Sequence, residues 1–455
     1  MRITLKQVVE ATGGELCGGD ATLEISGVST DSRTLQPAEL FVALPGERFE
    51  GHDFVAEAFA CGAAAAVVER ELLELGADQP LVIVEDSLRA YGQLANWYRS
   101  QFDVTVVAVT GSVGKTTTKN MIGSILAEHG PTLVAPGNLN NEVGVPRVLL
   151  SLTAQHQYCV VELAMRGPGE IGYLAQMASP QVGVITNVGE THLGLLGSRD
   201  AIAQAKAELL EALPDAGRAV LNADDFYSDL FAELSYCPTV SFGHDPQADV
   251  RIEDVKLCGL GGAEFVLQIG AESVPVQVSL PGRYNVANAA AAAAAAWAVT
   301  GSTDKIAAGL AGCPTEEMRT EVGHTSQGAT VINDAYNAAP RSVVAVLEML
   351  VQLPGRKVFV FGDMLELGSA AEEEHRRIGR LCIEQDIYWL VGVGRWAALA
   401  VEEAAAGGVR ADVAENAEQA VALIRPELIP SDVVLVKASR ALALERVVEG
   451  LMTDV

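Results

Sequence analysis

Continuous apolar runs recur along the chain and alternate with segments of helical pattern. In the first part of the chain these runs are short, and Gly, Pro and acidic residues separate them, at residues 40–44, 63–68 and 81–84. Longer runs rich in β-branched residues follow at residues 104–109, 158–161, 182–188 and 219–221. Runs of the second kind are typical of strands that are buried on both faces of a parallel sheet. The pattern therefore predicts an α/β protein.

Breaks in this pattern divide the chain into three parts. Residues 87–100 form a helical link to the second group of runs, and residues 288–299, almost all alanine, predict a tightly packed helix because alanine is the best helix former. Gly-Cys-Pro at residues 312–314 precedes a third group of runs. These lie at residues 330–332, 357–361, 388–391 and 433–436. Because 455 residues exceed what one core usually organises, we predict three domains, at residues 1–86, 87–313 and 314–455.

Composition narrows the class of protein. Hydrophobic residues make up 49% and charged residues 20%, and no apolar run reaches the ~18 residues of a membrane span, so we expect no membrane insertion. The residues after Met1 lack the pattern of a secretory signal, and the seven cysteines form no CxxC pair, which together favour the cytoplasm. A net charge of −28 argues against nucleic acid as a partner.

A phosphate-binding loop is the clearest local motif. Gly111-Ser112-Val113-Gly114-Lys115-Thr116-Thr117 follows the run at residues 104–109 and opens a helical pattern, the setting in which backbone N–H groups cradle phosphates. We expect all seven residues to bind ATP, with Lys115 at the β and γ phosphates and the Thr116 hydroxyl on Mg²⁺. The usual first glycine, six residues before the lysine, is replaced by Val109, so the loop is a shorter variant. A phosphate loop does not by itself identify the acceptor of the phosphate.

Five further blocks accompany this loop along the chain. They are Gly137-Asn-Leu-Asn-Asn-Glu-Val-Gly-Val-Pro146, Glu162-Leu-Ala-Met-Arg-Gly-Pro-Gly-Glu-Ile171, Asn333-Asp-Ala-Tyr-Asn-Ala-Ala-Pro340, Gly362-Asp-Met-Leu-Glu-Leu-Gly368 and Lys437-Ala-Ser-Arg440. In this order, and over essentially the whole chain, the six blocks resemble the bacterial Mur ligases. The Gly362 block and His375 resemble the dipeptide-adding branch of that family. Tyr284, Asn333 and Ala438 depart from the family, which usually has His, Asp and Gly there.

The resemblance implies a reaction and a fold. The terminal carboxylate of UDP-N-acetylmuramoyl-tripeptide would attack the γ-phosphate of ATP, and the amine of D-alanyl-D-alanine would then attack the acyl phosphate. Such in-line transfer needs positioning and charge neutralisation more than a protein nucleophile. The implied architecture is a small N-terminal α/β domain for the UDP-sugar, a central P-loop ATPase domain with a mostly parallel sheet, and a Rossmann-like C-terminal α/β domain for the dipeptide. We expect a monomer.

The resemblance also assigns metal ligands. Thr116, Glu162, His192 and Lys206 would hold two Mg²⁺ ions, with Lys206 carbamylated by CO₂. Glu162 ends an apolar run, at the edge where open α/β sheets bind ligands. Imidazole is an unusual Mg²⁺ ligand, so His192 depends on the resemblance alone. Carbamylation needs a neutral amine, so we predict that Lys206 is partly buried with a lowered pKa.

The remaining candidates come from all three domains. By family position, Arg319 and Asp334 would approach the γ-phosphate and the ribose from the third domain, while Asn138 and Asn288 would line the adenine side. The catalytic set would be Lys115, Lys206, His192 and Arg319, complete only when the domains close and exclude water. The UDP-sugar would be bound by Ser29, Asp31, Ser32, Arg33 and Arg48. The carboxylate of the dipeptide would be bound by Lys437 and Ser439. Of these, Arg33 and Arg48 suit a diphosphate.

Other functions remain open on the sequence. Gly392-Val-Gly-Arg-Trp-Ala397 after the run at residues 388–391, with Asp412 near the expected spacing, resembles a dinucleotide fingerprint and would suit a nicotinamide-dependent oxidoreductase. Another Mur ligase, or a ligase like folylpolyglutamate synthetase, would share the phosphate loop but use a different acceptor.

Overall fold

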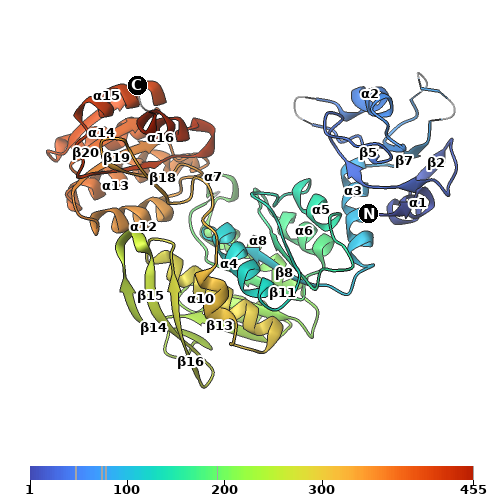
Figure 1. The fold of residues 1–455 in the computed structure, drawn as a ribbon, viewed down its shortest axis with the longest axis horizontal. Coiled ribbons are helices and arrows are strands. Elements are labelled where there is room, and N and C mark those ends of the chain that lie inside the picture. Colours follow the sequence, from blue (N-terminus) through green and yellow to red (C-terminus); the bar gives the residue numbers. More distant parts are fainter. Residues whose placement is uncertain (47–48, 73–74, 77–78, 192, 454–455) are drawn as a thin grey trace.

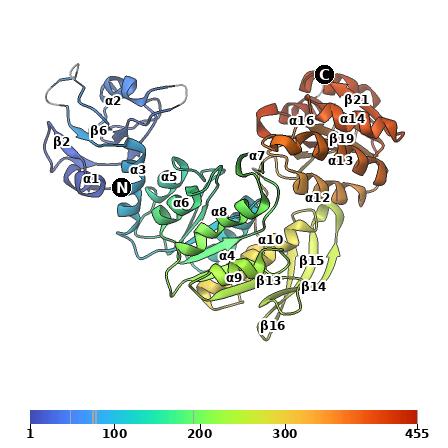
Figure 2. The same ribbon diagram turned by 180° about the vertical axis from the view of Figure 1, so that it is seen from behind.

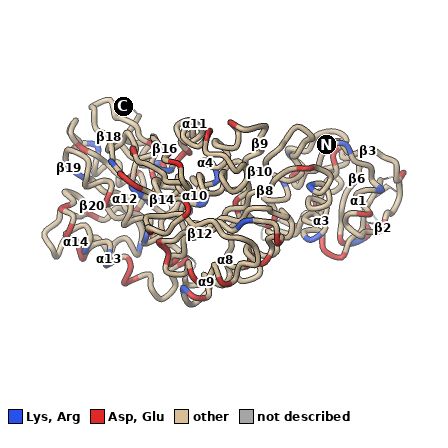
Figure 3. The backbone as a smooth tube through the Cα atoms, turned by 90° about the horizontal axis from the view of Figure 1, so that it is seen from below, with Lys and Arg blue, Asp and Glu red and all other residues tan. Residues whose placement is uncertain are grey.

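The computed structural model describes residues 1–455 except 47–48, 73–74, 77–78, 192 and 454–455. Three α/β units follow one another along the chain, and the first and third stand at opposite ends of the second in both views (Figures 1 and 2). Across the described residues, Lys and Arg are interspersed with Asp and Glu over all three units (Figure 3). In the same ranges, none of the helices has the length and apolar character needed to span a membrane.

The first unit is built on a small sheet of order β2-β7-β6-β5-β4, parallel except for the β2–β7 pair. Its elements are β1 Ile3–Thr4, α1 Leu5–Thr12, β2 Glu15–Cys17, β3 Glu24–Ile25, β4 Val28–Ser29, β5 Leu40–Val42, η1 Gly51–Phe54, α2 Val55–Ala60, β6 Ala65–Val68 and β7 Leu81–Ile83. The three apolar runs predicted here are therefore strands. Apolar residues on the two faces of the sheet pack against α2 on one side and α1 on the other.

Helix α3, Ser87–Arg99, joins the first two units, and the Asp86 carboxylate caps its start by accepting from the Arg89 N–H at 2.8 Å. It packs against α1 of the first unit and against α5 and α6 of the second. Since one helix serves both units, the division after residue 86 stays a prediction.

The central unit contains a nine-stranded sheet of order β16-β15-β14-β13-β12-β11-β8-β10-β9. Its strands are β8 Thr105–Thr110, β9 Thr132–Val134, β10 Tyr158–Glu162, β11 Val182–Ile185, β12 Arg218–Asn222, β13 Thr239–Gly243, β14 Val250–Leu257, β15 Ala263–Ile269 and β16 Glu272–Val278. From β9 to β14 in this order, neighbouring strands pair in parallel, which confirms the prediction for β8, β10, β11 and β12; β9 and β13 were not predicted. Strands β14, β15 and β16 pair antiparallel, and the sequence reasoning missed them.

Helices cover both faces of this sheet. The helices of this unit are α4 Lys115–Ala127, α5 Gly144–Leu149, α6 Glu170–Ala178, α7 Leu193–Leu196, α8 Arg199–Glu211, α9 Ser228–Leu234, η2 Gly259–Gly261, α10 Tyr284–Thr300 and α11 Ile306–Ala311, of which η2 lies in the turn between β14 and β15 and α7 packs on α8. Val107 and Val109 of β8 face the core of α4 and α10, whereas Val106 and Ala108 face α6 and α8. The predicted alanine helix is confirmed as α10, whose buried alanines let it lie close against α4 and β13.

The third unit repeats the layered arrangement around a sheet of order β17-β18-β22-β19-β20-β21, parallel except for β17. Its elements are β17 Glu321–His324, β18 Thr330–Asp334, α12 Pro340–Val351, β19 Arg356–Gly362, η3 Gly368–Ala370, α13 Ala371–Glu384, β20 Trp389–Val393, α14 Ala397–Ala406, β21 Arg410–Ala414, α15 Ala417–Ile424, η4 Arg425–Glu427, β22 Asp432–Lys437, η5 Arg440–Leu442 and α16 Glu445–Met452. Helices α12, α13 and α14 cover one face, and α15 and α16 the other. The expected Rossmann-like α/β fold is confirmed.

Candidate active site

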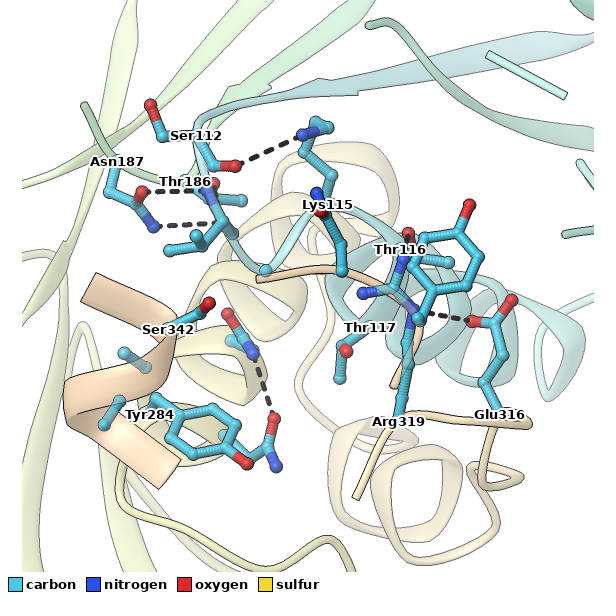
Figure 4. Close-up of a pocket in the computed structure, with 18 of the residues that line it drawn as sticks. Ser112, Lys115, Thr116, Thr117, Thr186, Asn187, Tyr284, Glu316, Arg319 and Ser342 are labelled. Atoms are coloured by element: carbon cyan, nitrogen blue, oxygen red, sulfur yellow. Dashed lines mark hydrogen bonds and ion pairs between the residues drawn. The ribbon is translucent and has the colours of Figure 1, made fainter. Parts of the chain in front are cut away.

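A cavity of about 360 Å³ lies where the central and third units meet (Figure 4). The carboxyl ends of β8, β10 and β11 come together at one edge of the central sheet, because parallel neighbours end in register. From this edge, from α10 and from the third unit, the lining residues include Ser112, Val113, Gly114, Lys115, Thr116, Thr117, Asn140, Glu162, Asn187, Thr191, Tyr284, Asn288, Arg319, Asp334, Arg341 and Lys437. The cavity thus joins most of the predicted nucleotide and metal residues.

The phosphate loop has a backbone that only glycine accommodates at two positions. Gly111 and Gly114 have φ of 148° and 84°, a region that side chains rarely adopt. A Cβ would lie 1.9 Å from Thr186 Oγ1 at the first position and 2.3 Å from Asn288 Oδ1 at the second. The loop therefore passes close to its neighbours and turns directly into α4, as predicted for a phosphate cradle.

Lys115, the first residue of α4, lies inside this cradle. Its Nζ donates to the carbonyl oxygens of Gly111 and Ser112, at 3.0 and 3.3 Å. Burial lowers the pKa of Lys115, because a charged amine is costly in a dry environment. The next side chain, Thr116, is buried, and its Oγ1 accepts a hydrogen bond of 2.9 Å from Arg319 Nη2 of the third unit. Two predicted ATP residues from different units are thus in direct contact.

Glu162 ends β10 at the same edge and is 2% exposed. Its Oε1 accepts from Asn140 Nδ2 at 2.8 Å, whereas its Oε2 is buried and has no hydrogen-bond partner in the part of the chain that the structure describes. Buried carboxylate oxygens normally have a donor or a cation. An oxygen-preferring cation such as Mg²⁺ fits this orphaned atom.

Lys206 of α8 is 2% exposed, and burial lowers its pKa well below the ordinary value, with the charge of Lys115 lowering it further. The predicted burial and lowered pKa are confirmed. His192 lies outside the described residues, although its neighbour Thr191 lines the cavity. Over the described ranges, no group of three His, Cys, Asp or Glu side chains could hold a metal ion. A carbamylated Lys206 would supply an additional anionic ligand.

Arg319 reaches the cavity from the strand-free segment before β17. Its guanidinium lies over the Tyr336 ring, 4.1 Å from the centroid, and Asn138 lies near the Tyr336 hydroxyl. Glu316 Oε2 accepts from Asn120 Nδ2 of α4 at 2.9 Å, a second bond between the units. Arg319 therefore lies at the phosphate loop. Asn138 is brought to Tyr336 and is not among the cavity-lining residues.

Asp334 and Lys437 end the neighbouring strands β18 and β22 and form an ion pair in the cavity. Asp334 Oδ1 also accepts from the Thr320 N–H at 3.0 Å, and Lys437 Nζ donates to the Asn337 carbonyl at 3.0 Å. Ser439 turns elsewhere, since its Oγ accepts from the Leu365 N–H at 2.9 Å. Lys437 lines the cavity, whereas Ser439 is not among its lining residues.

The predicted UDP-sugar residues lie in the first unit, far along the chain from this cavity. Arg33 donates to the Asp31 carboxylate through Nε and Nη2, at 2.9 and 2.7 Å, and these bonds lower the pKa of Asp31 to about 2. Ser29 Oγ accepts from the Asp31 N–H at 3.2 Å, and Ser32 is buried. Arg48 lies outside the described residues. The Arg33 fork is thus engaged by Asp31 and would have to exchange this partner for a diphosphate.

The prediction of a dinucleotide-binding turn at residues 392–397, leading into α14, is wrong. Asp363 Oδ1 accepts from the N–H groups of Trp396 and Ala397 at 2.9 and 2.7 Å, so a carboxylate occupies the helix start where a pyrophosphate would bind. Asp412, expected at a ribose, instead accepts from Trp389 Nε1 at 2.8 Å. The glycines mark a tight turn between strand and helix.

The sequence reasoning missed Asn187 and Arg341. The Asn187 amide holds Val113 from both sides, accepting its N–H at 3.1 Å and donating to its carbonyl at 3.0 Å. Asn187 lies in the apolar run at residues 182–188, just after the end of β11, so its place at the sheet edge was the available signal. Nothing in the local sequence marks Arg341, whose contacts are with the central unit.

His375 of α13 holds the Gly362 block in place. It is completely buried; its Nε2 accepts from the Met364 N–H at 2.9 Å, and its Nδ1 lies 2.6 Å from the Ala371 carbonyl, to which it donates. Burial lowers the pKa of His375, so the ring is neutral at pH 7. This arrangement explains why the histidine accompanies the block.

We expect His375→Phe to lower the free energy of unfolding by about 1–3 kcal/mol, because it leaves the Met364 N–H buried without an acceptor. The unfolded chain binds a proton at pH values where the folded chain does not, so the contribution of His375 is complete above its ordinary pKa of 6.5 and is lost as pH falls below it. Denaturation at a series of pH values checks both effects. An unchanged pH slope in the variant would contradict this role of His375.

Comparison with known proteins agrees with this geometry. Residues 24–99 match the Mur ligase family catalytic domain, residues 109–296 the Mur ligase middle domain, and residues 318–440 the Mur ligase glutamate ligase domain. The UDP-N-acetylmuramoyl-tripeptide–D-alanyl-D-alanine ligase of Escherichia coli K12 is 38% identical, over 99% of each chain. The enzyme of that name from Bacillus subtilis 168 is 35% identical, over 99% of this chain and 98% of the relative.

Solved structures extend the likeness to the fold. A crystal structure of MurF from Acinetobacter baumannii superposes with a TM-score of 0.93 at 36% identity, covering 99% of each chain. MurF ligase from Thermotoga maritima in complex with ADP superposes with a TM-score of 0.82 at 29% identity, over 94% of this chain and 97% of that one. The chain belongs to the Mur ligase family.

Proposed function

We infer that this chain is an ATP-dependent ligase that joins D-alanyl-D-alanine to UDP-N-acetylmuramoyl-tripeptide, forming the pentapeptide precursor of peptidoglycan. The observation that carries this inference is the full-length similarity to ligases of this name from distant bacteria. The cavity supports it physically, because it combines a phosphate loop with basic groups from a second unit. That arrangement suits transfer of a phosphoryl group to a substrate carboxylate.

For ATP, we assign the phosphates to the loop from Gly111 to Thr117, with Lys115 neutralising charge on the β and γ phosphates. Arg319 supports the γ-phosphate, since its hydrogen bond to Thr116 already brings it to the loop. Asp334 is assigned to the ribose. Asn288 and Asn138 are assigned to the adenine side, Asn288 with the stronger support because it lines the cavity beside Gly114.

For the metal, we assign Thr116, Glu162, His192 and a carbamylated Lys206 to two Mg²⁺ ions. The orphaned Glu162 Oε2 and the buried amine of Lys206 support this assignment. Mg²⁺ would neutralise charge on the phosphates during transfer. Meanwhile Lys115 and Arg319 hold the γ-phosphate, and the third unit shelters the acyl phosphate from water until the amine attacks.

The substrates are assigned to the outer units. Ser29, Asp31, Ser32, Arg33 and Arg48 would bind the UDP-sugar in the first domain. Ser439 would bind the dipeptide carboxylate in the third domain, and Lys437 would join it only by leaving Asp334. We place the domains at residues 1–86, 87–313 and 314–455 and expect a cytoplasmic monomer.

The experiment that tests this function measures phosphate release from ATP with UDP-N-acetylmuramoyl-tripeptide, with and without D-alanyl-D-alanine. We expect sustained release only when the dipeptide is present, together with a nucleotide product larger by one dipeptide. Equal release with a single amino acid in place of the dipeptide would instead assign the chain to another branch of the family.

We expect Glu162→Gln to raise the Mg²⁺ concentration for half-maximal activity by roughly tenfold or more, because an amide is a neutral and weaker ligand than a carboxylate. A Mg²⁺ titration at saturating ATP measures this. The control is Glu264→Gln, which changes an exposed carboxylate on β15 that pairs with Lys256. Equal Mg²⁺ requirements in the two variants would remove Glu162 from the metal site.

A further inference from the structure

Arg341, near the start of α12, makes several contacts with the central unit. Its Nη1 donates to the Val188 carbonyl at 2.8 Å. Its Nε lies 3.8 Å from Glu190 Oε2, and its Nη1 lies 4.0 Å from Asp225 Oδ2. Its Cδ packs against Gly189, since a Cβ added to Gly189 would lie 3.1 Å from Arg341 Cδ. The arginine therefore lies along the loop at residues 187–190, which follows β11.

This loop is also the support of the phosphate loop. The Ser112 N–H donates to the Asn187 carbonyl at 2.9 Å, and the Gly189 N–H donates to Ser112 Oγ at 2.8 Å. The Asn187 side chain holds Val113 in addition. A displacement of residues 187–190 would therefore move Ser112 and Val113, whose backbone belongs to the cradle for ATP.

Two carboxylates and two guanidiniums surround the loop. Asp225 is almost completely buried, with 4% of its side chain exposed, and Glu190 is 23% exposed. Arg199 of α8 supplies one guanidinium, which contacts the Val188 carbonyl at 3.3 Å and lies 3.7 Å from Glu190 Oε1. Arg341 supplies a second from the other unit. When the third unit moves away, the two carboxylates lose that charge.

We propose that Arg341 is a positioning residue that ties the third unit to the phosphate loop through residues 187–190, so that ATP binding and docking of the third unit favour each other. Two facts suit such a coupling. The guanidinium fork donates a hydrogen bond to a carbonyl and also lies within 4.0 Å of two carboxylates, a reach that the single ammonium of a lysine does not have. It is also 44% exposed, so the contact is weak enough to open and close during turnover. The inference rests on the proposed function for the identity of the nucleotide.

Steady-state kinetics of the full chain provide the first test. Because tenfold in affinity corresponds to about 1.4 kcal/mol, a modest and partly solvated contact predicts that Arg341→Ala raises the KM for ATP roughly three- to tenfold. The KM for D-alanyl-D-alanine should change less than twofold. The matched control is Arg377→Ala, which removes an exposed arginine of α13 that pairs with Glu374 of the same helix. Unchanged ATP KM in Arg341→Ala overturns the proposal.

Amide hydrogen exchange separates positioning from direct contact with ATP, and it does not depend on ligase activity. In Arg341→Ala without nucleotide, the amides of Ser112 and Gly189 should exchange several-fold faster than in the parent and in Arg377→Ala. A raised ATP KM with unchanged exchange would show that Arg341 contacts the nucleotide itself, and would overturn the proposal. Faster exchange in a chain without dipeptide-dependent turnover would support the coupling while removing the ligase assignment.

A double-mutant cycle with Glu190→Gln tests the path. If the coupling runs through the loop, Arg341→Ala should raise the ADP dissociation constant less in the Glu190→Gln background than in the parent chain. Arg341→Lys should recover part of the loss, because it restores one donor and the charge. Fully additive effects in the cycle would overturn the proposed route.

Discussion

Replacing Lys115 by Ala is expected to lower ATP turnover by at least about 10³-fold, the largest effect of any single change in the cavity. Lys115 is the basic group of the phosphate loop itself, and its amine is held within the loop by the carbonyls of Gly111 and Ser112. When ATP binds, that amine can turn from two neutral carbonyls to phosphate oxygens, which are stronger acceptors. Alanine removes this positive charge from the place where the negative charge of the transferred phosphoryl group is concentrated.

The variant should remain folded, because Lys115 is a half-buried side chain and its desolvation opposes folding. Circular dichroism and thermal unfolding check this, and phosphate release measures turnover. Lys256→Ala, an exposed lysine of β14 paired with Glu264, is the matched control and should keep parent activity. Substantial turnover by a folded Lys115→Ala protein would mean that the loop is not the phosphate site.

Replacing Lys206 by Met is expected to reduce the rate by roughly 10²-fold or more, a loss comparable to that of a metal ligand or its support. Burial and the nearby charge of Lys115 lower the pKa of Lys206, so the amine is neutral over a range where an exposed lysine is protonated. Only the neutral amine reacts with CO₂. The resulting carbamate would be an anion near Lys115 and could share metal ions with Glu162.

Two measurements check this prediction. Carbon-13-labelled bicarbonate should give a carbamate signal in the parent that disappears in Lys206→Met, and activity should fall in buffer stripped of CO₂. Acid should suppress the signal, because lower pH protonates the amine. The control Lys305→Met alters an exposed lysine before α11 and should keep both signal and activity. A fully active Lys206→Met enzyme would exclude the carbamate from the mechanism.

The parallel core was predictable because its strands are buried on both faces and read as continuous apolar runs. Strands β8, β10 and β11 are of this kind. Helix α10 was predictable for another reason, its nearly unbroken run of alanine, which is buried. Strands β14 to β16 were missed because they pair antiparallel and alternate buried with exposed residues over much of their length, as in the Ala263–Ile269 strand. Such alternation gives no apolar run, and the glycines at residues 259–262 and 270, which mark the two turns, were overlooked.

Within the site, local motifs were predictable and tertiary contacts were not. The phosphate loop depends on its own glycines and on the strand before it, so sequence order was enough. Lys437 was assigned to the dipeptide, but its ion pair with Asp334 depends on two strands far apart in sequence becoming neighbours. Arg341 was missed for the same reason, since its partners belong to another unit.

The central claim is that this cavity activates a substrate carboxylate by transferring the γ-phosphate of ATP to it. The most direct test uses UDP-N-acetylmuramoyl-tripeptide whose terminal carboxylate carries heavy oxygen, with ATP and D-alanyl-D-alanine. An acyl phosphate predicts that one labelled oxygen leaves with each inorganic phosphate, which mass spectrometry detects. Unlabelled phosphate alongside pentapeptide formation would show that the carboxylate was never phosphorylated and would contradict this account.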